Sequence, residues 1–194
     1  MKYRYVLASA SPRRKELLKE IIDEFEIIPS NADESVEETL APELFVATLA
    51  KRKAAEVALR AENDGKIVIG SDTVVAFGKE ILGKPKDEND AYRMLSLLSG
   101  RKHAVYTGVC FAKAENGILK TRTQTVKTDV FFFNLSDEYI KEYIRGGSPM
   151  DKAGAYGIQD GGLVEKISGS YSNVVGFPVE YAKDEIERIE KSGL

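Results

Sequence analysis

Apolar residues in this chain alternate between short runs and longer stretches with helical spacing. Strand-like runs, rich in β-branched and aromatic residues, cover residues 3–8, 25–28, 67–76, 103–113 and 119–133. Helical spacing recurs in residues 12–22, 42–60, 87–98, 136–144 and 177–189. The alternation of the two patterns predicts an α/β fold.

Local signals mark several of these boundaries. Ser11 and Pro12 supply an N-cap and a first-turn proline, Pro42 opens the long second helix, and Ser136 caps a later one. The Asn116-Gly117 pair between the two longest strands predicts a tight hairpin. Since a hairpin interrupts the helix-strand alternation, we expect a mixed sheet rather than a purely parallel one.

Composition narrows the class of protein. With 194 residues, 43% hydrophobic and 30% charged, the chain is expected to form one domain, or two closely fused lobes, with a sizeable core. The net charge of −3 argues against nucleic acid or an anionic membrane as a partner. Neither a membrane span nor a signal peptide is evident, so a cytoplasmic location is expected. The single cysteine, Cys110, sits in an apolar run and is expected to be a buried hydrophobe.

The most informative candidate is Asp72, which interrupts the apolar run 67–76 as part of Gly70-Ser71-Asp72-Thr73. Burying an ionised carboxylate without partners costs several kcal/mol, so the fold must supply cations or donors to it. This pattern indicates a functional site. The alternative is that Asp72 only caps a turn between two short strands.

Basic residues suited to phosphate occur in three other segments. Arg13 and Arg14 lie in the first turn of a helix, where the helix dipole disfavours cations unless an anion is bound; Ser9 lies in the turn before it. The alternative is that both arginines are solvated on a surface helix. Lys53 falls on the apolar stripe of the 42–60 helix, so it either snorkels to solvent or reaches a cleft. Lys84 is held in an extended backbone between Gly83 and Pro85.

Acidic and polar loops complete the inventory. The loop with Asp33, Glu34, Glu37 and Glu38 could join Asp72 in holding Mg²⁺ or Mn²⁺, although acidic surface loops are common. The glycine-rich stretch 153–176 is expected to be irregular, and the polar segment 149–159 that overlaps its start has the character of a ligand-binding loop.

The only histidine, His103, is expected to be structural, which excludes a histidine-based triad and multi-histidine metal sites. The chain thus offers cations for phosphates, carboxylates for a divalent metal and no evident nucleophile. Such groups support metal-assisted attack of water at phosphorus.

Eight motifs, in chain order, resemble those of the Maf family of nucleotide pyrophosphatases. They are Leu7–Leu18 (LASASPRRKELL), Asp33-Glu34, Ala50–Ala54 (AKRKA), Gly70–Thr73 (GSDT), Leu82–Pro85 (LGKP), Thr107–Val109 (TGV), Asp151–Gln159 (DKAGAYGIQ) and Gly169–Gly176 (GSYSNVVG). The resemblance covers nearly the whole chain, 1–194. It implies a single α/β unit of two lobes around an elongated, bent mixed sheet, similar to inosine triphosphate pyrophosphatases.

The resemblance also implies an activity, namely hydrolysis of a nucleoside triphosphate to the monophosphate and pyrophosphate with a divalent cation. Arg13, Thr73 and Gln159 occupy positions that, in the family, distinguish the branch acting on dTTP and UTP from the 7-methyl-GTP branch. The chain therefore resembles a dTTP/UTP pyrophosphatase that would also act on modified pyrimidine nucleotides.

Site roles follow as hypotheses from the same resemblance. Asp72 would be the general base or a metal ligand, with Glu34 as the second metal carboxylate. Ser9, Arg14, Lys53 and Lys84 would hold the phosphates and stabilise charge, and Gln159 can both donate to and accept from a uracil or thymine edge. The expected partners are the nucleotide and, as an option the sequence leaves open, a second copy of the chain in a homodimer.

Two other functions compete with this interpretation. One is a non-enzymatic nucleotide-binding regulator of cell division or septum formation, which would need the phosphate-binding groups but not Asp72 or a metal. The other is a purine pyrophosphatase of the inosine triphosphate type.

Overall fold

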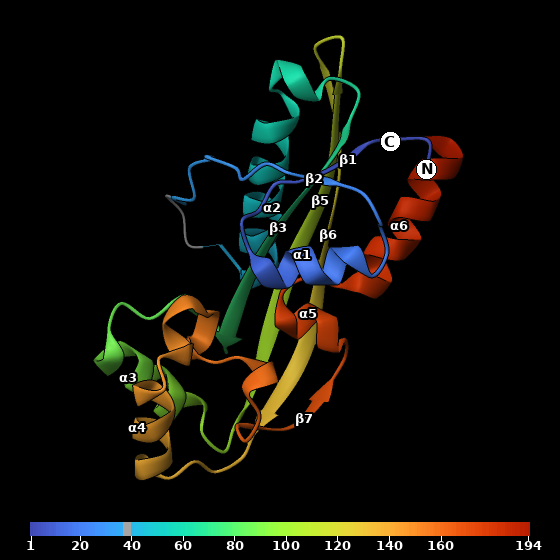
Figure 1. Ribbon diagram of the computed structural model, residues 1–194. Coiled ribbons are helices and arrows are strands. Elements are labelled where there is room, and N and C mark those ends of the chain that lie inside the picture. Colours follow the sequence, from blue (N-terminus) through green and yellow to red (C-terminus); the bar gives the residue numbers. More distant parts are fainter. Residues whose placement is uncertain (37–39) are drawn as a thin grey trace.

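The computed structural model of the protein describes residues 1–36 and 40–194. Its strands form one seven-stranded sheet in the order β2-β1-β3-β5-β6-β7, with β4 paired to β3 (Figure 1). The strands are β1 (Tyr5–Leu7), β2 (Glu26–Ile27), β3 (Ile67–Phe77), β4 (Glu80–Leu82), β5 (Lys102–Glu115), β6 (Ile118–Phe132) and β7 (Val164–Ser168). The strand β1 is parallel to β2 and β3, and the other pairs are antiparallel, so the predicted mixed sheet is confirmed.

In the described part of the chain, six α-helices and four short 3₁₀ turns accompany the sheet. The helices are α1 (Pro12–Lys19), α2 (Pro42–Ala58), α3 (Glu88–Leu98), α4 (Asp137–Arg145), α5 (Tyr171–Val175) and α6 (Val179–Ser192). The 3₁₀ turns are η1 (Ala61–Asn63), η2 (Ser148–Asp151), η3 (Ala153–Ala155) and η4 (Ile158–Asp160). The first helix begins at Pro12 and the second at Pro42, as their start signals predict.

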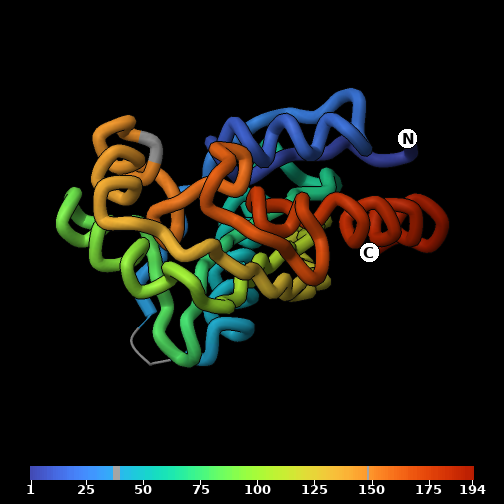
Figure 2. Tube along the Cα trace, turned by 90° about the horizontal axis from the view of Figure 1, so that it is seen from below, coloured from blue at the N-terminus to red at the C-terminus, as the bar shows by residue number. Residues whose placement is uncertain are grey.

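The first lobe has three layers, with α2 on one face of the sheet and α1 and α6 on the other. Alternate residues of each strand point to opposite faces, so Val68 packs toward α2 while Ile67 and Ile69 pack toward α1 and α6. Figures 1 and 2 place the N-terminus beside α6, where the Lys2 amide donates to Glu190 Oε2 at 2.6 Å. Both faces of β1, β3 and β5 are therefore buried in this lobe.

The second lobe is built around α3, α4 and the 3₁₀ turns η2, η3 and η4, and it packs on the far ends of β3, β5 and β6. Its core is a separate cluster that includes Leu95 of α3, Ile140 of α4 and Phe132 of β6. The long β5-β6 hairpin runs through both lobes and joins them (Figure 1). The expected two-lobed α/β architecture is confirmed.

Between the lobes, one edge of β3 is open. The strand β1 pairs with residues 67–69 of β3, and β4 pairs with residues 75–77 on the same side. Within the described part of the chain, no strand pairs with residues 70–74 along this edge. On its other side β3 is paired continuously with β5, so the gap is a stable feature of a well-supported strand. Asp72 lies in this gap, and because β3 is unbroken there, the turn-cap alternative for Asp72 is wrong.

Two glycines allow α2 to lie directly on the sheet next to the gap. A Cβ atom on Gly70 would lie 2.4 Å from the Ala50 carbonyl oxygen, and one on Gly108 would lie 2.3 Å from that of Val46. Contacts this short with backbone atoms do not occur without displacement of the helix. Gly108 is also the register partner of Asp72, so it leaves room beside the carboxylate.

The hairpin prediction is confirmed by its backbone. Asn116 and Gly117 both have positive φ, at 51° and 78°, as a two-residue type I′ turn requires. The turn fixes the register of the long β5-β6 pair, in which Glu115 faces Ile118.

The expectation that residues 153–176 are irregular is wrong, because they contain β7 and α5. The edge strand β7 pairs only with the end of β6, and its five residues lie between Gly161-Gly162 and Gly169. The helix α5 is also five residues long and is fixed by a cap from Ser170. Both are too short for apolar periodicity to reveal. Likewise α1 ends at Lys19, before Ile22, although Ile22 is buried as expected.

The close approach of α2 yields a stability prediction. We expect Gly70→Ala to lower the free energy of unfolding by about 1–3 kcal/mol, because the added methyl overpacks the interface between helix and sheet. Gly83→Ala is the matched control, since its new Cβ would have no atom within 4 Å and its φ is not positive. Thermal and denaturant unfolding would measure both, and equal stabilities would contradict the close-packing argument.

Candidate functional site

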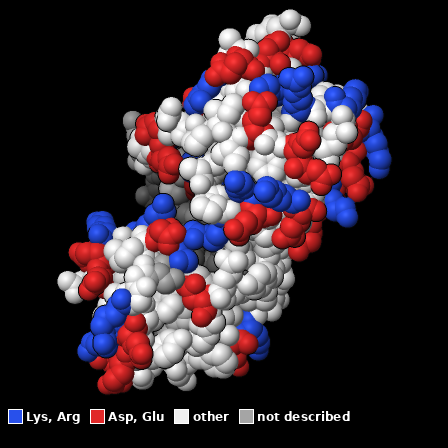
Figure 3. All heavy atoms as spheres, in the orientation of Figure 1, with Lys and Arg blue, Asp and Glu red and all other residues white. Residues whose placement is uncertain are grey.

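A cavity of about 730 Å³ lies between the lobes, over the open edge of β3. Nine of the residues proposed from the sequence line it: Ser9, Arg13, Arg14, Glu34, Lys53, Asp72, Thr73, Lys84 and Gln159. Figure 3 shows Lys and Arg side chains gathered at the hollow between the lobes, with acidic side chains beside them. The cavity lining includes five cationic and three acidic side chains, so its net charge favours an anion.

Asp72 is paired with a lysine from the helix above it. Lys53 Nζ donates to Asp72 Oδ1 at 2.7 Å, and both side chains are only 12% exposed. The same ammonium lies 3.0 Å from Glu34 Oε1, at the more exposed rim. The contact exists because Asp72 and Gly70 share the face of β3 on which α2 packs. Lys53 therefore points inward and reaches the cavity, which is one of the two alternatives that the sequence left open.

Burial dominates the titration of Asp72. Loss of solvent raises the pKa of the Asp72 carboxyl, while the Lys53 ammonium, in direct contact, and the Arg14 guanidinium oppose the rise. The carboxylate thus depends on nearby positive charge to remain ionised. A group held in this way, inside a cleft, is a candidate for proton transfer or metal binding.

The pair formed by Asp72 and Glu34 is suited to a divalent cation. Both carboxylates already converge on one positive centre, the Lys53 ammonium, at 2.7 and 3.0 Å. Among the described residues no group of three or more His, Cys, Asp or Glu side chains converges to form a complete cage. Mg²⁺ commonly binds through one or two carboxylates together with substrate phosphates and water, so a two-carboxylate set fits it.

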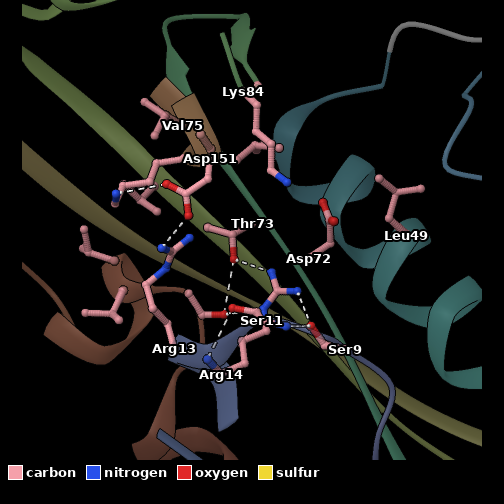
Figure 4. A pocket seen from close by; sticks show the side chains of 18 of the residues that line it. Ser9, Ser11, Arg13, Arg14, Leu49, Asp72, Thr73, Val75, Lys84 and Asp151 are labelled. Carbon is pink, nitrogen blue, oxygen red and sulfur yellow. Dashed lines mark hydrogen bonds and ion pairs between the residues drawn. The ribbon is translucent and has the colours of Figure 1, made fainter. Parts of the chain in front are cut away.

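Arg14 is held on the opposite face of β3. Its Nε donates to the Gly176 carbonyl at 3.1 Å, Nη1 to Ser9 Oγ at 3.3 Å and Nη2 to Thr73 Oγ1 at 3.2 Å (Figure 4). Burial lowers the pKa of the Arg14 guanidinium, and the Asp72 carboxylate acts in the opposite direction. All three acceptors are neutral, so these hydrogen bonds fix the guanidinium without placing a carboxylate in contact with it.

The turn before α1 is built to present these groups. Ser11 caps the helix by accepting from the Arg14 amide at 3.4 Å, and its own amide donates to Ser9 Oγ at 3.2 Å. Ser9 Oγ therefore faces both the helix start and the Arg14 side chain. Ser9 and Arg14, proposed separately from the sequence, form one unit.

Arg13 spans the cavity to the second lobe. Its Nη1 donates to Asp151 Oδ2 at 3.0 Å, and Lys152 Nζ lies 3.1 Å from Asp151 Oδ1 (Figure 4). These contacts lower the pKa of the Asp151 carboxyl, against the effect of its partial burial. Gln159 lies in η4, eight positions after Asp151, and lines the same cavity.

Lys84 approaches from the loop after β4, and in Figure 4 its side chain points into the cavity near Asp72. The Gly83 carbonyl accepts from the Gly154 amide at 3.0 Å, which ties this loop to the segment around η3. Lys53 of the first lobe and Lys84 of the second lobe thus line the same cavity.

Some cavity groups were missed by the residue-level analysis of the sequence. Asp151 and Lys152 were placed only within a segment of ligand-binding character, and Tyr156 was not given a role. Tyr156 lines the cavity and its hydroxyl lies 2.8 Å from His103 Nε2. The backbone carbonyl of Gly176, which holds Arg14, has no signal in side-chain chemistry at all.

Other expectations are settled by position. His103 is buried, and burial lowers its pKa to about 4, so it is neutral at physiological pH. Cys110 is fully buried, and burial raises its pKa to about 11.

Of the other acidic residues in the loop, Asp33 accepts hydrogen bonds from Ser35 and does not line the cavity. Glu37 and Glu38 lie outside the described residues. None of the described helices has the length and apolar character needed to cross a lipid bilayer.

The comparisons with known proteins identify the family of this chain. The sequence model of the family described as Maf-like protein matches residues 4–189. A protein of Thermococcus gammatolerans named dTTP/UTP pyrophosphatase is 53% identical over 177 residues, which are 90% of this chain and 91% of that protein. Proteins with the same name from Clostridium novyi and Geotalea uraniireducens are 50% and 47% identical, covering 90% and 95% of this chain and 91% and 94% of their own lengths.

A solved structure is also similar in fold. The Staphylococcus aureus Ham1 protein superposes with a TM-score of 0.52, covering 95% of this chain and 98% of that one. At 15% sequence identity, this likeness concerns the fold alone.

The Lys53-Asp72 contact yields a prediction on titration. We expect Lys53→Met to raise the pKa of the Asp72 carboxyl further, because the variant removes the nearest charge that favours the ionised form. The carboxyl carbon signal of Asp72, assigned by its loss in Asp72→Asn, would report the shift by NMR in the ligand-free protein. Lys51→Met, on the exposed side of α2, is the control. An unchanged or lower pKa in Lys53→Met would contradict the contact.

Proposed function

The chain belongs to the Maf-like protein family, and from this membership we propose that it hydrolyses dTTP and UTP to the monophosphate and pyrophosphate. The same site would accept modified pyrimidine nucleotides. Relatives at about 50% identity over most of the chain carry the name dTTP/UTP pyrophosphatase. The observation that carries the proposal is Asp72, a buried carboxylate at an open strand edge inside a cavity where cations outnumber acids.

The phosphates would bind to the cations of both lobes. Ser9 and Arg14, already oriented by their mutual contact, face the cavity from the first lobe. Lys53 reaches it from α2, and Lys84 from the loop after β4. Water attacks the α-phosphorus, the bond to the bridging oxygen breaks, and pyrophosphate leaves with increased negative charge. Fixed cations stabilise this charge most in a water-poor cleft.

Asp72 and Glu34 would hold Mg²⁺ or Mn²⁺, since both already face one cationic centre. When bound, the cation would neutralise phosphate charge and acidify water. The Lys53 ammonium now lies between the two carboxylates, so it would have to move away as the cation enters, and the phosphates offer it a new partner. Asp72 would accept the water proton directly or act as a ligand.

Base recognition would take place near the cavity mouth. Gln159 is exposed there, and its amide can match both the donor and the acceptor of a pyrimidine edge. Arg13, held by Asp151, would act beside it. Thr73 would act through Arg14, because its hydroxyl accepts from that guanidinium.

The proposed partner is therefore a small-molecule nucleotide in the cytoplasm, with no nucleic acid or membrane involved and a homodimer as an open proposal. The decisive test is pyrophosphate release from dTTP, UTP, dATP, GTP and ITP, with and without Mg²⁺. Metal-dependent release, fastest for dTTP and UTP, would support the proposal. Fastest release from ITP would favour a purine enzyme, and binding without release would favour a nucleotide-binding regulator.

Removal of the Asp72 carboxylate should abolish most of this activity. Asp72→Asn is expected to lower kcat about 10²–10⁴-fold for a lost general base, with the fold retained. Asp184→Asn, on the exposed surface of α6, is the control. If Asp72 acts mainly as a metal ligand, excess Mn²⁺ should restore part of the rate. Near-normal turnover of Asp72→Asn at the Mg²⁺ concentration used for the wild type, without excess Mn²⁺, would rule out both roles.

Gln159 should control the choice of base. We expect Gln159→Ala to reduce the ratio of kcat/KM for dTTP over dATP about tenfold, as the loss of one hydrogen bond predicts. The other glutamine of the chain, Gln124 on the exposed face of β6, supplies the control Gln124→Ala. Parallel losses for both nucleotides in Gln159→Ala would assign Gln159 to general binding instead of base recognition.

A further inference from the structure

A chain of hydrogen bonds runs from the cavity into the interior of the sheet. Arg14 Nη2 donates to Thr73 Oγ1 at 3.2 Å, Thr73 Oγ1 lies 3.0 Å from Thr107 Oγ1, and Thr107 Oγ1 donates to the Asn173 carbonyl at 3.0 Å. Thr73 and Thr107 are register partners on β3 and β5. Thr107 is fully buried and does not line the cavity. Thr107 is linked to the cavity through Thr73 and Arg14, which both line it.

The donor at one end and the acceptor at the other set the direction of this chain of hydrogen bonds. Guanidinium nitrogens only donate and a carbonyl oxygen only accepts. With its one proton given to Asn173, Thr107 Oγ1 is left as an acceptor for the Thr73 hydroxyl. The Gly176 carbonyl, 3.3 Å from Thr73 Oγ1, is a second acceptor for the same proton. The lone pairs of Thr73 are thereby left for Arg14, and hydrogen bonds that point the same way strengthen one another.

Asn173 also helps to fix the Gly176 carbonyl, which is another acceptor of Arg14. Asn173 is fully buried, and its Nδ2 donates to Thr128 Oγ1 at 3.0 Å on β6 and to the Val105 carbonyl at 3.3 Å on β5. These bonds fasten α5 to the sheet. Gly176 ends α5, and its carbonyl accepts from Arg14 Nε at 3.1 Å.

We propose that Thr107 and Asn173 are positioning residues for Arg14, holding its guanidinium in the orientation that receives a polyphosphate. Prior orientation spares the entropy that a free arginine side chain loses on binding. A guanidinium also binds phosphate best in a fixed bidentate geometry. The inference rests on the proposed function for its substrate, but the orientation of Arg14 can be measured without turnover.

Substitutions at Thr107 isolate its hydroxyl. Thr107→Val is nearly isosteric with the native residue, and Thr107→Ser and Thr107→Ala differ from each other by one oxygen atom. We expect KM for dTTP to rise about tenfold in the Val and Ala variants, with a smaller change in kcat, because binding to ground and transition states is lost together. Thr107→Ser should remain near wild type. Thr121→Val on β6 is the matched control.

A double-mutant cycle separates positioning from general stability. In an Arg14→Ala background, the Val substitution should cause no further rise in KM, since the two act through one group. If Thr107→Val does not fold, Thr107→Ala replaces it in the cycle, and Thr107→Ser is the variant that keeps the hydroxyl. Equal KM values for Ser and Ala, or a full additional loss without Arg14, would overturn the inference.

Two readouts keep this test apart from the proposed function. The Arg14 Nε–H signal in NMR should exchange faster with water in Thr107→Val and Thr107→Ala than in Thr107→Ser. Calorimetric titration with inorganic pyrophosphate should show about tenfold weaker binding in the same two variants. If wild type hydrolyses no triphosphate, the proposed function fails while these signals still decide the role of Thr107. If hydrolysis occurs and both signals match wild type in all variants, the inference fails alone.

Discussion

The pairing of a buried carboxylate with a lysine, Asp72 with Lys53, is the interaction on which the rest of the site depends. Asp72 lies inside a sheet, where an unpaired charge costs several kcal/mol. The counter-charge comes from α2, and it can reach Asp72 only because the helix rests directly on the backbone of two glycines, Gly70 and Gly108. The ion pair therefore depends on the packing of α2, since a side chain at either glycine would displace the helix and move Lys53 away from the carboxylate.

The cavity itself is a consequence of strand lengths. The strands β1 and β4 are three residues each, and they flank β3 at its two ends, so the middle of its edge stays open. Each lobe has its own core, and β5 and β6 connect them. Groups from distant segments therefore converge on one place. The arginines come from the start of α1, the lysines from α2 and the loop after β4, and Gln159 from a 3₁₀ turn of the second lobe.

The features that could be predicted from the sequence are those set by neighbouring residues in the chain. Start signals located α1 and α2, the Asn116-Gly117 pair located the hairpin, and a charge in an apolar run identified Asp72. The elements β7 and α5 were missed because five residues cannot display a period and their positions are set by pairing with β6 and by capping. Nine of the proposed site residues line one cavity, whereas Asp33 does not. Their hydrogen-bond partners could not be predicted from local sequence patterns. Thr107 appeared only as part of a motif, since its hydrogen bonds to Thr73 and Asn173 exist only across the sheet and α5.

Strand alternation explains how one cavity can hold both an acid and an unneutralised arginine. Asp72 and Thr73 are consecutive on β3, so their side chains leave opposite faces of the sheet. Asp72 meets Lys53, a point charge on a flexible stem that can change partners when phosphate arrives. Arg14 lies on the Thr73 face, and among the described residues no carboxylate forms an ion pair with it; its forked group is bound by neutral oxygens. Had the two residue types been exchanged, a bidentate arginine pair would have held the carboxylate firmly and left less positive charge for a polyphosphate. The distribution of lysine and arginine over the two faces therefore keeps the acid exchangeable and the anion-binding group available.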